Sequence, residues 1–201
     1  MAHIPDGVVA APVLLAGAVV AAGGVALGLR ALTPERIPRV AVLSAAFFVA
    51  SLIHLPAGPA SVHLILNGLM GAVLGAAAFP AIVVALLLQA VLFGFGGLMV
   101  LGVNVMNMGV PALLAGMVFR GLYRRNHPRR TALLGAACGG GAVVLTAVMV
   151  AASLGLSGRE FLPAARLVML TALPVVVVEA AFTAAALGLI ARVKPELLEA
   201  S

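Results

Sequence analysis

Long apolar runs, separated by short charged or glycine- and proline-containing breaks, follow one another along nearly the whole chain. Hydrophobic residues make up 64% of the sequence and charged residues 9%, against about 25% charged residues in an ordinary soluble domain. A helix needs about 20 mostly apolar residues to cross roughly 30 Å of hydrocarbon, so 201 residues hold six or seven crossings and little else. We therefore expect one integral membrane domain, residues 1–201.

The apolar runs predict an all-α bundle of about seven transmembrane helices. Charged residues, prolines and glycines bound them near Val8–Leu29, Ile37–Ile53, Val62–Ala77, Phe79–Phe93, Met108–Leu122, Thr131–Leu154 and Pro163–Ala191. The stretch GFGGLMVLGVNVMNMG, between the fourth and fifth runs, is predicted to be non-helical and buried inside the bundle. Irregular backbone at membrane depth is tolerated only where protein or a cavity surrounds it.

The cationic residues predict the orientation of the bundle. With seven spans, alternate connections lie on opposite sides of the membrane, and ten of the twelve cations then fall on one side. The other side has only Arg159 and Arg166. The positive-inside rule therefore predicts a cell inner (cytoplasmic) membrane protein with its N-terminus outside and its C-terminus inside. The ten are Arg30, Arg36, Arg39, Arg120, Arg124, Arg125, Arg129, Arg130, Arg192 and Lys194.

Several classes of protein are excluded by the same pattern. The basic residues lie between apolar runs and form no amphipathic face with interleaved aromatic residues, which argues against nucleic acid as a partner. The single cysteine, Cys138, excludes a disulfide within the chain and a multi-cysteine metal site. The first run lacks a basic n-region, so we expect it to remain as a span and not to act as a signal peptide.

The chain starts MAHIPDG, with a histidine third from its amino end. A free amine followed closely by histidine can hold a divalent ion with the amine, the intervening backbone nitrogens and the imidazole, and planar nitrogen ligation suits Ni²⁺ or Cu²⁺. His3, His54 and His63 fall at the outer ends of predicted spans, whereas His127 falls in the inner loop RRNHPRR. We therefore predict that the chain end is itself a metal ligand.

Two versions of this site remain open, and they differ in whether Met1 is removed. If Met1 stays, its amine, the amide nitrogens of Ala2 and His3 and the His3 ring supply four donors, and His63 is an axial or outer group. If Met1 is removed, the Ala2 amine, the His3 amide and the His3 ring supply three, and His63 completes the square. Neither Ala2 nor His3 is proline, so each backbone nitrogen exists in both versions.

The residues after His3 favour a tight turn, because proline followed by aspartate and glycine is typical of turns. Such a turn can fold the chain end back among the helices. The alternative is that Pro5, Asp6 and Gly7 merely precede the first helix and leave His3 in solvent.

Four further residues are candidates for the pocket. Glu179 falls near the middle of the last run, where a charged group costs roughly 2.5–3.5 kcal/mol and normally faces a partner or cavity. It is interpreted either as an acceptor for the second N–H of a ligand histidine or as a protonated residue bonded to a neighbouring helix. Asn104 and Asn107 can satisfy backbone groups or hold the N-terminal loop. His54 is interpreted as a rim residue that guides cations.

At these residues the sequence resembles the substrate-binding S components of energy-coupling-factor transporters for nickel and cobalt, the CbiM/NikM family. The resemblance covers nearly the whole chain and rests on His-Ile-Pro-Asp-Gly near the start, GPASVHL, QAVLFGFGGLMVLGVNVMNMG and the ending EAAFTAAALGLIARVKPELL. In the family the first histidine typically stands directly after methionine, whereas here Ala2 intervenes.

The resemblance implies that Ni²⁺ or Co²⁺ is the transported substrate, held in a square-planar site by the terminal amine, the amide and ring of His3 and the ring of His63. It implies that Asn104 and Asn107 lie beside this pocket. It also implies a transmembrane coupling subunit, ATP-binding cassette ATPases and a small auxiliary membrane subunit as partners, within membrane lipid. No prosthetic group is implied.

Two other functions are weighed against metal capture. A self-sufficient secondary transporter or channel for a divalent cation is the alternative, but it predicts inverted repeats and broken helices, and the sequence has no visible repeat. An enzyme such as an intramembrane metalloprotease is disfavoured, because HLPAGPASVH lacks the glutamate of His-Glu-x-x-His. The chain also has no Gly-x-x-x-x-Gly-Lys-Ser/Thr motif, so ATP hydrolysis is expected on separate subunits.

Overall fold

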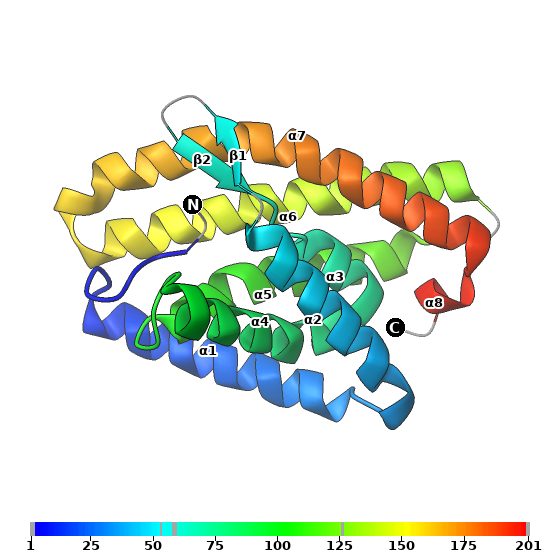
Figure 1. Ribbon diagram of the computed structural model, residues 1–201, viewed down its shortest axis with the longest axis horizontal. Helices are drawn as coiled ribbons and strands as arrows, with labels where there is room; N and C mark the ends of the chain where they lie inside the picture. The colour runs from blue at the N-terminus through cyan, green and yellow to red at the C-terminus, as the bar shows by residue number, and fades with distance from the viewer. Residues whose placement is uncertain (1–2, 53, 58–59, 126, 200–201) are drawn as a thin grey trace.

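The protein, described by a computed structural model over residues 3–52, 54–57, 60–125 and 127–199, is a bundle of helices with one small hairpin at its edge (Figure 1). This confirms the predicted all-α membrane bundle. The helices are α1 (Ala11–Arg30), α2 (Ile37–Leu52), α3 (Asn67–Leu74), α4 (Ala78–Phe93), α5 (Leu101–Leu122), α6 (Pro128–Ser157), α7 (Leu162–Val193) and the short α8 (Glu196–Glu199).

Within these ranges, five helical segments are long and apolar enough to cross a membrane. The chain is therefore a multi-pass membrane protein. In one of the five segments the chain turns back at Gly75, whose φ of 60° belongs to the left-handed region, so that α3 and α4 run in opposite directions. The five are Ala11–Arg30, Asn67–Phe93, Leu101–Leu122, Pro128–Ser157 and Arg159–Val193.

Successive helices α1 to α7 alternate in direction, as Figure 1 shows, so the connections collect at two ends of the bundle. One end, the basic end, carries the α1–α2 and α5–α6 connections and the last described residues. An ion pair of 3.2 Å joins Arg125 Nη1 to Glu199 Oε2 there, and Arg129, Arg130 and Arg192 line one shared hollow. The opposite end carries the N-terminal segment, residues 94–100 and the α6–α7 connection.

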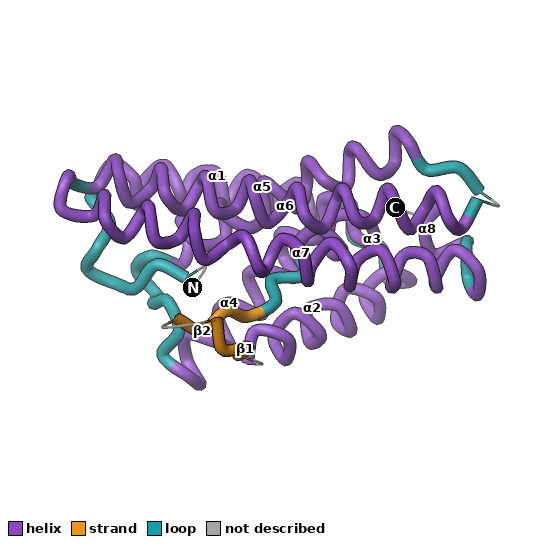
Figure 2. Tube along the Cα trace, turned by 90° about the horizontal axis from the view of Figure 1, so that it is seen from above, coloured by secondary structure: helices purple, strands orange, loops and turns teal. Residues whose placement is uncertain are grey.

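The predicted span Val62–Ala77 is wrong in its first part. Strands β1 (His54–Ala57) and β2 (Ala60–His63) form an antiparallel hairpin in which His54 is opposite His63. Helix α3 begins only at Asn67 and has 8 residues. A short apolar run such as VHLIL fits a strand as well as a helix, so its periodicity could not decide between them. Figure 2 shows the hairpin at the edge of the bundle, beside the described start of the chain.

The stretch predicted to be non-helical is half helical. Residues 94–100 are irregular, with Gly94 and Gly96 at positive φ, but α5 begins at Leu101, ahead of the predicted Met108. Gly102 lets α1 pack closely against this part of α5, because a Cβ there would lie 2.7 Å from the Cα of Ala18. The backbone of this part of α5 is thus buried within a regular helix.

Among the described residues, two clusters of buried apolar side chains hold the bundle together. The larger surrounds α3, α4 and α5 and extends to the basic end. The smaller lies at the opposite end and gathers Val100, Val103, Val150 and Leu154 around Ile4, which is 2% exposed. Burial of a side chain of this size is worth about 1.5–3 kcal/mol, so Ile4 anchors the N-terminal segment inside the protein.

Candidate metal centre

The two predicted ligand histidines meet, although 60 positions separate them in the sequence. The ring centroids of His3 and His63 are 5.1 Å apart, and the rings are stacked with an angle of 17° between their planes. His63 is 6% exposed, at the end of β2. The alternative in which His3 extends into solvent is therefore wrong: the chain end folds back against the bundle and brings the two imidazoles together.

Asn104 of α5 fixes the backbone directly after His3. Its side-chain oxygen accepts a hydrogen bond from the Ile4 N–H at 3.0 Å, and its amide nitrogen donates to the Ile4 carbonyl at 3.0 Å. Both bonds are buried, and Asn104 is 2% exposed. Through this reciprocal pair the N-terminal segment is attached to α5 much as a strand is attached to its neighbour.

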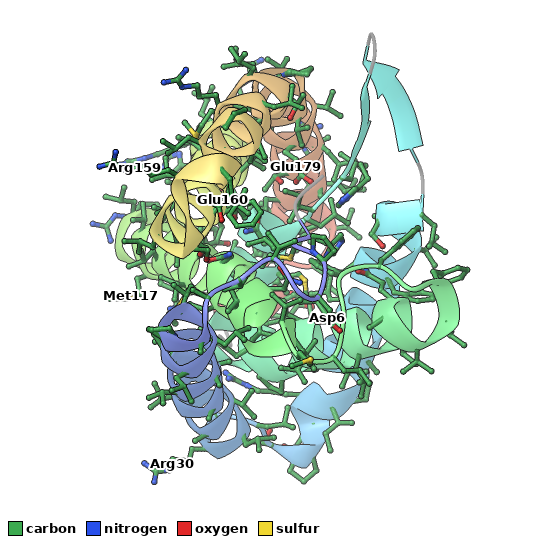
Figure 3. The ribbon with its side chains drawn as sticks, turned by 90° about the vertical axis from the view of Figure 1, so that its left-hand side faces the viewer. Asp6, Arg30, Met117, Arg159, Glu160 and Glu179 are labelled. Carbon is green, nitrogen blue, oxygen red and sulfur yellow. The ribbon has the colours of Figure 1, made fainter. Side chains whose placement is uncertain are left out.

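Asp6 makes a second attachment at the beginning of the same helix. Its carboxylate accepts a hydrogen bond from the Val100 N–H at 2.9 Å. Val100 is the N-cap position of α5, where unpaired N–H groups and the helix dipole favour a negative charge. Gly97 makes this approach possible, because a Cβ there would lie 2.1 Å from the carboxyl carbon of Asp6. Figure 3, viewed from this end, shows Asp6 where the N-terminal segment meets the loop before α5.

The far side of the segment is bound to α6. The Ala10 N–H donates to the Ser157 hydroxyl at 3.1 Å, and that hydroxyl donates to the Ser153 carbonyl at 2.7 Å. Residues 4–10 are thus hydrogen-bonded to two different helices. The position of His3 is consequently set by the bundle and not by local turn geometry alone.

The His63 ring has a defined environment of its own. Its Nδ1 lies 3.0 Å from the Leu64 carbonyl oxygen, which favours the tautomer with the proton on Nδ1 and the lone pair on Nε2. A cavity of about 30 Å³ lies beside the ring and is also lined by Ile65, Thr146 and Thr171. A larger hollow of about 430 Å³ adjoins His3 between the outer halves of α6 and α7.

These donors fit a small dication that prefers nitrogen. Metal–imidazole bonds are about 2.0–2.1 Å long, so two rings must approach as closely as His3 and His63 do to bind one ion. In the described part of the chain no three side chains of His, Cys, Asp or Glu come together. Met1 and Ala2, the other predicted ligands, lie outside the described residues.

The other candidate residues occupy distinct places. Asn107 accepts a hydrogen bond from the Ser153 hydroxyl at 3.3 Å and ties α5 to α6. Glu179 is fully buried in α7 and accepts hydrogen bonds from the N–H groups of Ile65 and Leu66, just after His63. The backbone of His54 pairs with His63 across the hairpin, and its side chain lies outside the described part.

The family model described as "Cobalt uptake substrate-specific transmembrane region" matches residues 3–197. The chain belongs to this family, CbiM. A "Putative metal transport protein" of Haemophilus influenzae is 41% identical over 199 residues, covering 98% of this chain and 96% of the relative.

Other similar proteins carry transition-metal names. A "Fused nickel transport protein NikMN" of Rhodobacter capsulatus is 42% identical over 83 residues, which cover 40% of this chain and 24% of that protein. A solved structure described as a truncated transition metal transporter superposes with a TM-score of 0.68 at 27% identity, covering 96% of this chain and 98% of that one. The CbiM fold is thus shared over the full extent of the bundle.

Sequence reasoning missed the roles of Asp6 and Ser157 in this CbiM chain. Pro-Asp-Gly is typical of turns, so the sequence assigns Asp6 only to a turn and assigns no role to Ser157. Their partners lie 94 and 147 positions away. Asp6 lies within the same His-Ile-Pro-Asp-Gly segment as His3, and that proximity was the one signal available.

Proposed function

We propose that this chain is the membrane-embedded substrate-capture subunit of an energy-coupling-factor transporter that takes up Ni²⁺ or Co²⁺. The metal is held in a square-planar site of four nitrogens that includes the free end of the chain. The observation that carries the proposal is the approach of the His3 and His63 rings to 5.1 Å at the end of the bundle opposite the basic loops.

The ligands are the terminal amine, the amide nitrogen and ring of His3, and the ring of His63. This set is that of the chain without Met1, in which Ala2 supplies the amine; if Met1 is retained, its amine, the amide nitrogens of Ala2 and His3 and the His3 ring form the plane, and His63 is axial or outer. Binding displaces protons from the amine, the amide and the imidazoles, so acid weakens it. Amide nitrogen donors in a plane favour Ni²⁺ or Cu²⁺ over Co²⁺ by geometry.

The attachments around the chain end supply rigidity. Asn104, Asp6 and Ser157 hold residues 4–10 on α5 and α6, so little conformational entropy is lost when the metal binds. A rigid planar site also discriminates against ions that require octahedral oxygen ligands, such as Mg²⁺. Beside the pocket, Asn104 holds the backbone of the N-terminal segment and Asn107 holds α5 against α6. His54 is a residue of the rim.

Transport follows from the orientation of the bundle. With the basic end in the cytoplasm, the histidines face the outside and collect the ion there. A coupling subunit and ATP-binding cassette ATPases then drive release inward, with a small auxiliary membrane subunit as a further partner. The fused organisation of the Rhodobacter capsulatus relative supports cooperation with an additional component. The metal is the cargo, and no prosthetic group takes part.

The decisive experiment is a titration of Ni²⁺ and of Co²⁺ into purified protein with a free and with an acetylated amino terminus. Lys194 is the single lysine of the chain, so a Lys194→Arg background leaves the terminal amine as the only primary amine to acetylate. His63→Ala removes the second imidazole, and His127→Ala, at the opposite end, is the matched control.

Acetylation and His63→Ala are each expected to lower Ni²⁺ affinity by about 100-fold or more, because each removes a primary ligand. His127→Ala is expected to leave affinity unchanged. Equal affinity in all of these proteins would refute the site. Uptake of Ni²⁺ into vesicles that contain this chain alone would instead favour a self-sufficient transporter or channel.

A further inference from the structure

The segment that follows His63 has an unusual backbone conformation. Between β2 and α3 the chain passes through Leu64, Ile65 and Leu66, and Leu66 has a φ of 53°. Among the described residues it is the one non-glycine residue with positive φ. A side chain rarely adopts this conformation unless its surroundings impose it. The direction in which the His63 ring points depends on this strained junction.

Glu179 of α7 is hydrogen-bonded to this junction. One carboxylate oxygen, Oε1, accepts hydrogen bonds from the N–H groups of both Ile65 and Leu66, the latter at 2.7 Å. Glu179 is 0% exposed and comes from the middle of α7, more than 110 positions away in the sequence. Figure 3 shows the labelled Glu179 on the α7 ribbon, on the same side of the bundle as the hairpin.

The two N–H groups depend on this acceptor. Ile65 and Leu66 are 6% and 4% exposed, so water cannot replace the carboxylate without a rearrangement. A buried backbone N–H without a partner is unfavourable, and the junction would shift to find one. Because His63 is only two residues from Ile65, and because both line the same small cavity, such a shift moves the ring away from His3.

We propose that Glu179 is a positioning residue of the metal centre: it holds the His63 imidazole at the metal by accepting the backbone N–H groups of residues 65 and 66. It acts as a hydrogen-bond acceptor of the right reach, and it neither binds the ion nor contributes through its charge. This inference rests on the proposed function, since it specifies how one of the ligands is placed.

The reach and the charge of Glu179 can be separated by substitution. Glu179→Gln keeps the length of the side chain and an acceptor oxygen but removes the acidic group, and a carbonyl oxygen can accept both N–H groups. Glu179→Asp keeps the acidic group but is one methylene shorter, so it cannot reach both. Thr183→Val is the matched control: Thr183 is also 0% exposed and lies one turn farther along α7, with no bond to the junction.

Each variant is purified with the native chain end, checked for folding by thermal unfolding, and titrated with Ni²⁺ while the ligand-field absorption of the bound ion is recorded. Glu179→Asp is expected to weaken Ni²⁺ binding about 10–100-fold and to alter the square-planar absorption band, as changes to groups that orient metal ligands do. Glu179→Gln is expected to stay within about threefold of the native protein, and Thr183→Val likewise. Exchange of the Ile65 and Leu66 amide hydrogens should accelerate only in Glu179→Asp.

The outcomes separate this inference from the proposed function. If His63→Ala loses Ni²⁺ but Glu179→Asp binds it like the native protein, the positioning role is refuted and the site stands. If Glu179→Asp binds normally and Glu179→Gln does not, charge and not reach is the property that matters, and the inference is likewise wrong. If His63→Ala binds Ni²⁺ as well as the native protein, the proposed site itself fails.

Discussion

Replacing Asn104 by alanine tests how far the metal centre depends on the docking of the chain end. The substitution removes both hydrogen bonds to Ile4, each 3.0 Å long and buried. A typical buried hydrogen bond contributes about 1–1.5 kcal/mol, so the pair contributes about 2–3 kcal/mol to holding the segment in place. At 1.4 kcal/mol per factor of ten, the docked population is expected to fall about 30–150-fold relative to the undocked one.

The consequence for binding depends on how firmly the segment is docked beforehand. Burial of the Ile4 side chain still favours the docked segment in Asn104→Ala, so the loss of Ni²⁺ affinity is smaller than the shift in docking. We expect the affinity to fall about 10–100-fold. Asn104→Asp keeps an acceptor for the Ile4 N–H but loses the donor to its carbonyl, and is expected to lie between native and alanine. Calorimetric titration of Ni²⁺ gives the affinities.

Gln89→Leu is the control for loss of a buried amide. Gln89 is 0% exposed, and its side chain donates to the Ser51 hydroxyl at 2.7 Å, between α4 and α2. It is expected to alter thermal stability but not Ni²⁺ affinity. If Asn104→Ala binds Ni²⁺ as tightly as the native protein while remaining folded, the docking of residues 4–6 does not hold the ligand and the reasoning is wrong.

Three further results are expected. Gly97→Ala should weaken Ni²⁺ binding about 5–10-fold, because the new Cβ would displace the Asp6 carboxylate from α5. Loss of one charged hydrogen bond accounts for a decrease of this order, and competition with a chelator measures it. Gly71→Ala should lower the unfolding temperature and reduce the free energy of unfolding by about 1–3 kcal/mol, because the new Cβ would lie 1.8 Å from the Ala112 carbonyl oxygen. Gly23 has open space around it, so Gly23→Ala should not destabilise the protein. Ni²⁺ affinity should fall steadily as pH is lowered, since protons compete for the amine and for both imidazoles. The dependence of affinity on pH should be shallower in His63→Ala, and a pH-independent affinity would contradict nitrogen ligation.

The sequence was sufficient to predict the membrane bundle and the two histidines. Apolar runs of about 20 residues have few alternatives to a spanning helix, and a histidine next to a chain end has a recognisable coordination chemistry. The spans and the chelating chain end are read from residues close together in the sequence, whereas the choice of His63, 60 positions from His3, depends on the predicted topology and on the family resemblance. Helix α1, expected at Val8–Leu29, was accordingly found at Ala11–Arg30, near its predicted bounds.

The errors occurred where distant contacts decide local structure. Residues 62–66 are predicted to be part of a helix, but residues 62 and 63 end strand β2, and Glu179 of α7 accepts the N–H groups of Ile65 and Leu66 where Leu66 has a positive φ. The beginning of α5 is predicted to be irregular because the stretch is rich in glycine, yet it is helical, and its Asn104 bonds Ile4, 100 positions away. No local pattern contains these pairings, so they could be learned only from the fold.

The central claim is that His3, His63 and the chain end bind one ion together. X-ray absorption at the nickel edge, on the Ni²⁺-loaded protein, tests it most directly, because the edge shape distinguishes square-planar from octahedral nickel and the outer-shell scattering reports imidazole ligands. We predict a planar shell of nitrogen donors with imidazole scattering that diminishes in His63→Ala and a planar edge feature that is lost on acetylation of the terminus. An octahedral, oxygen-rich shell that neither change affects would contradict the account.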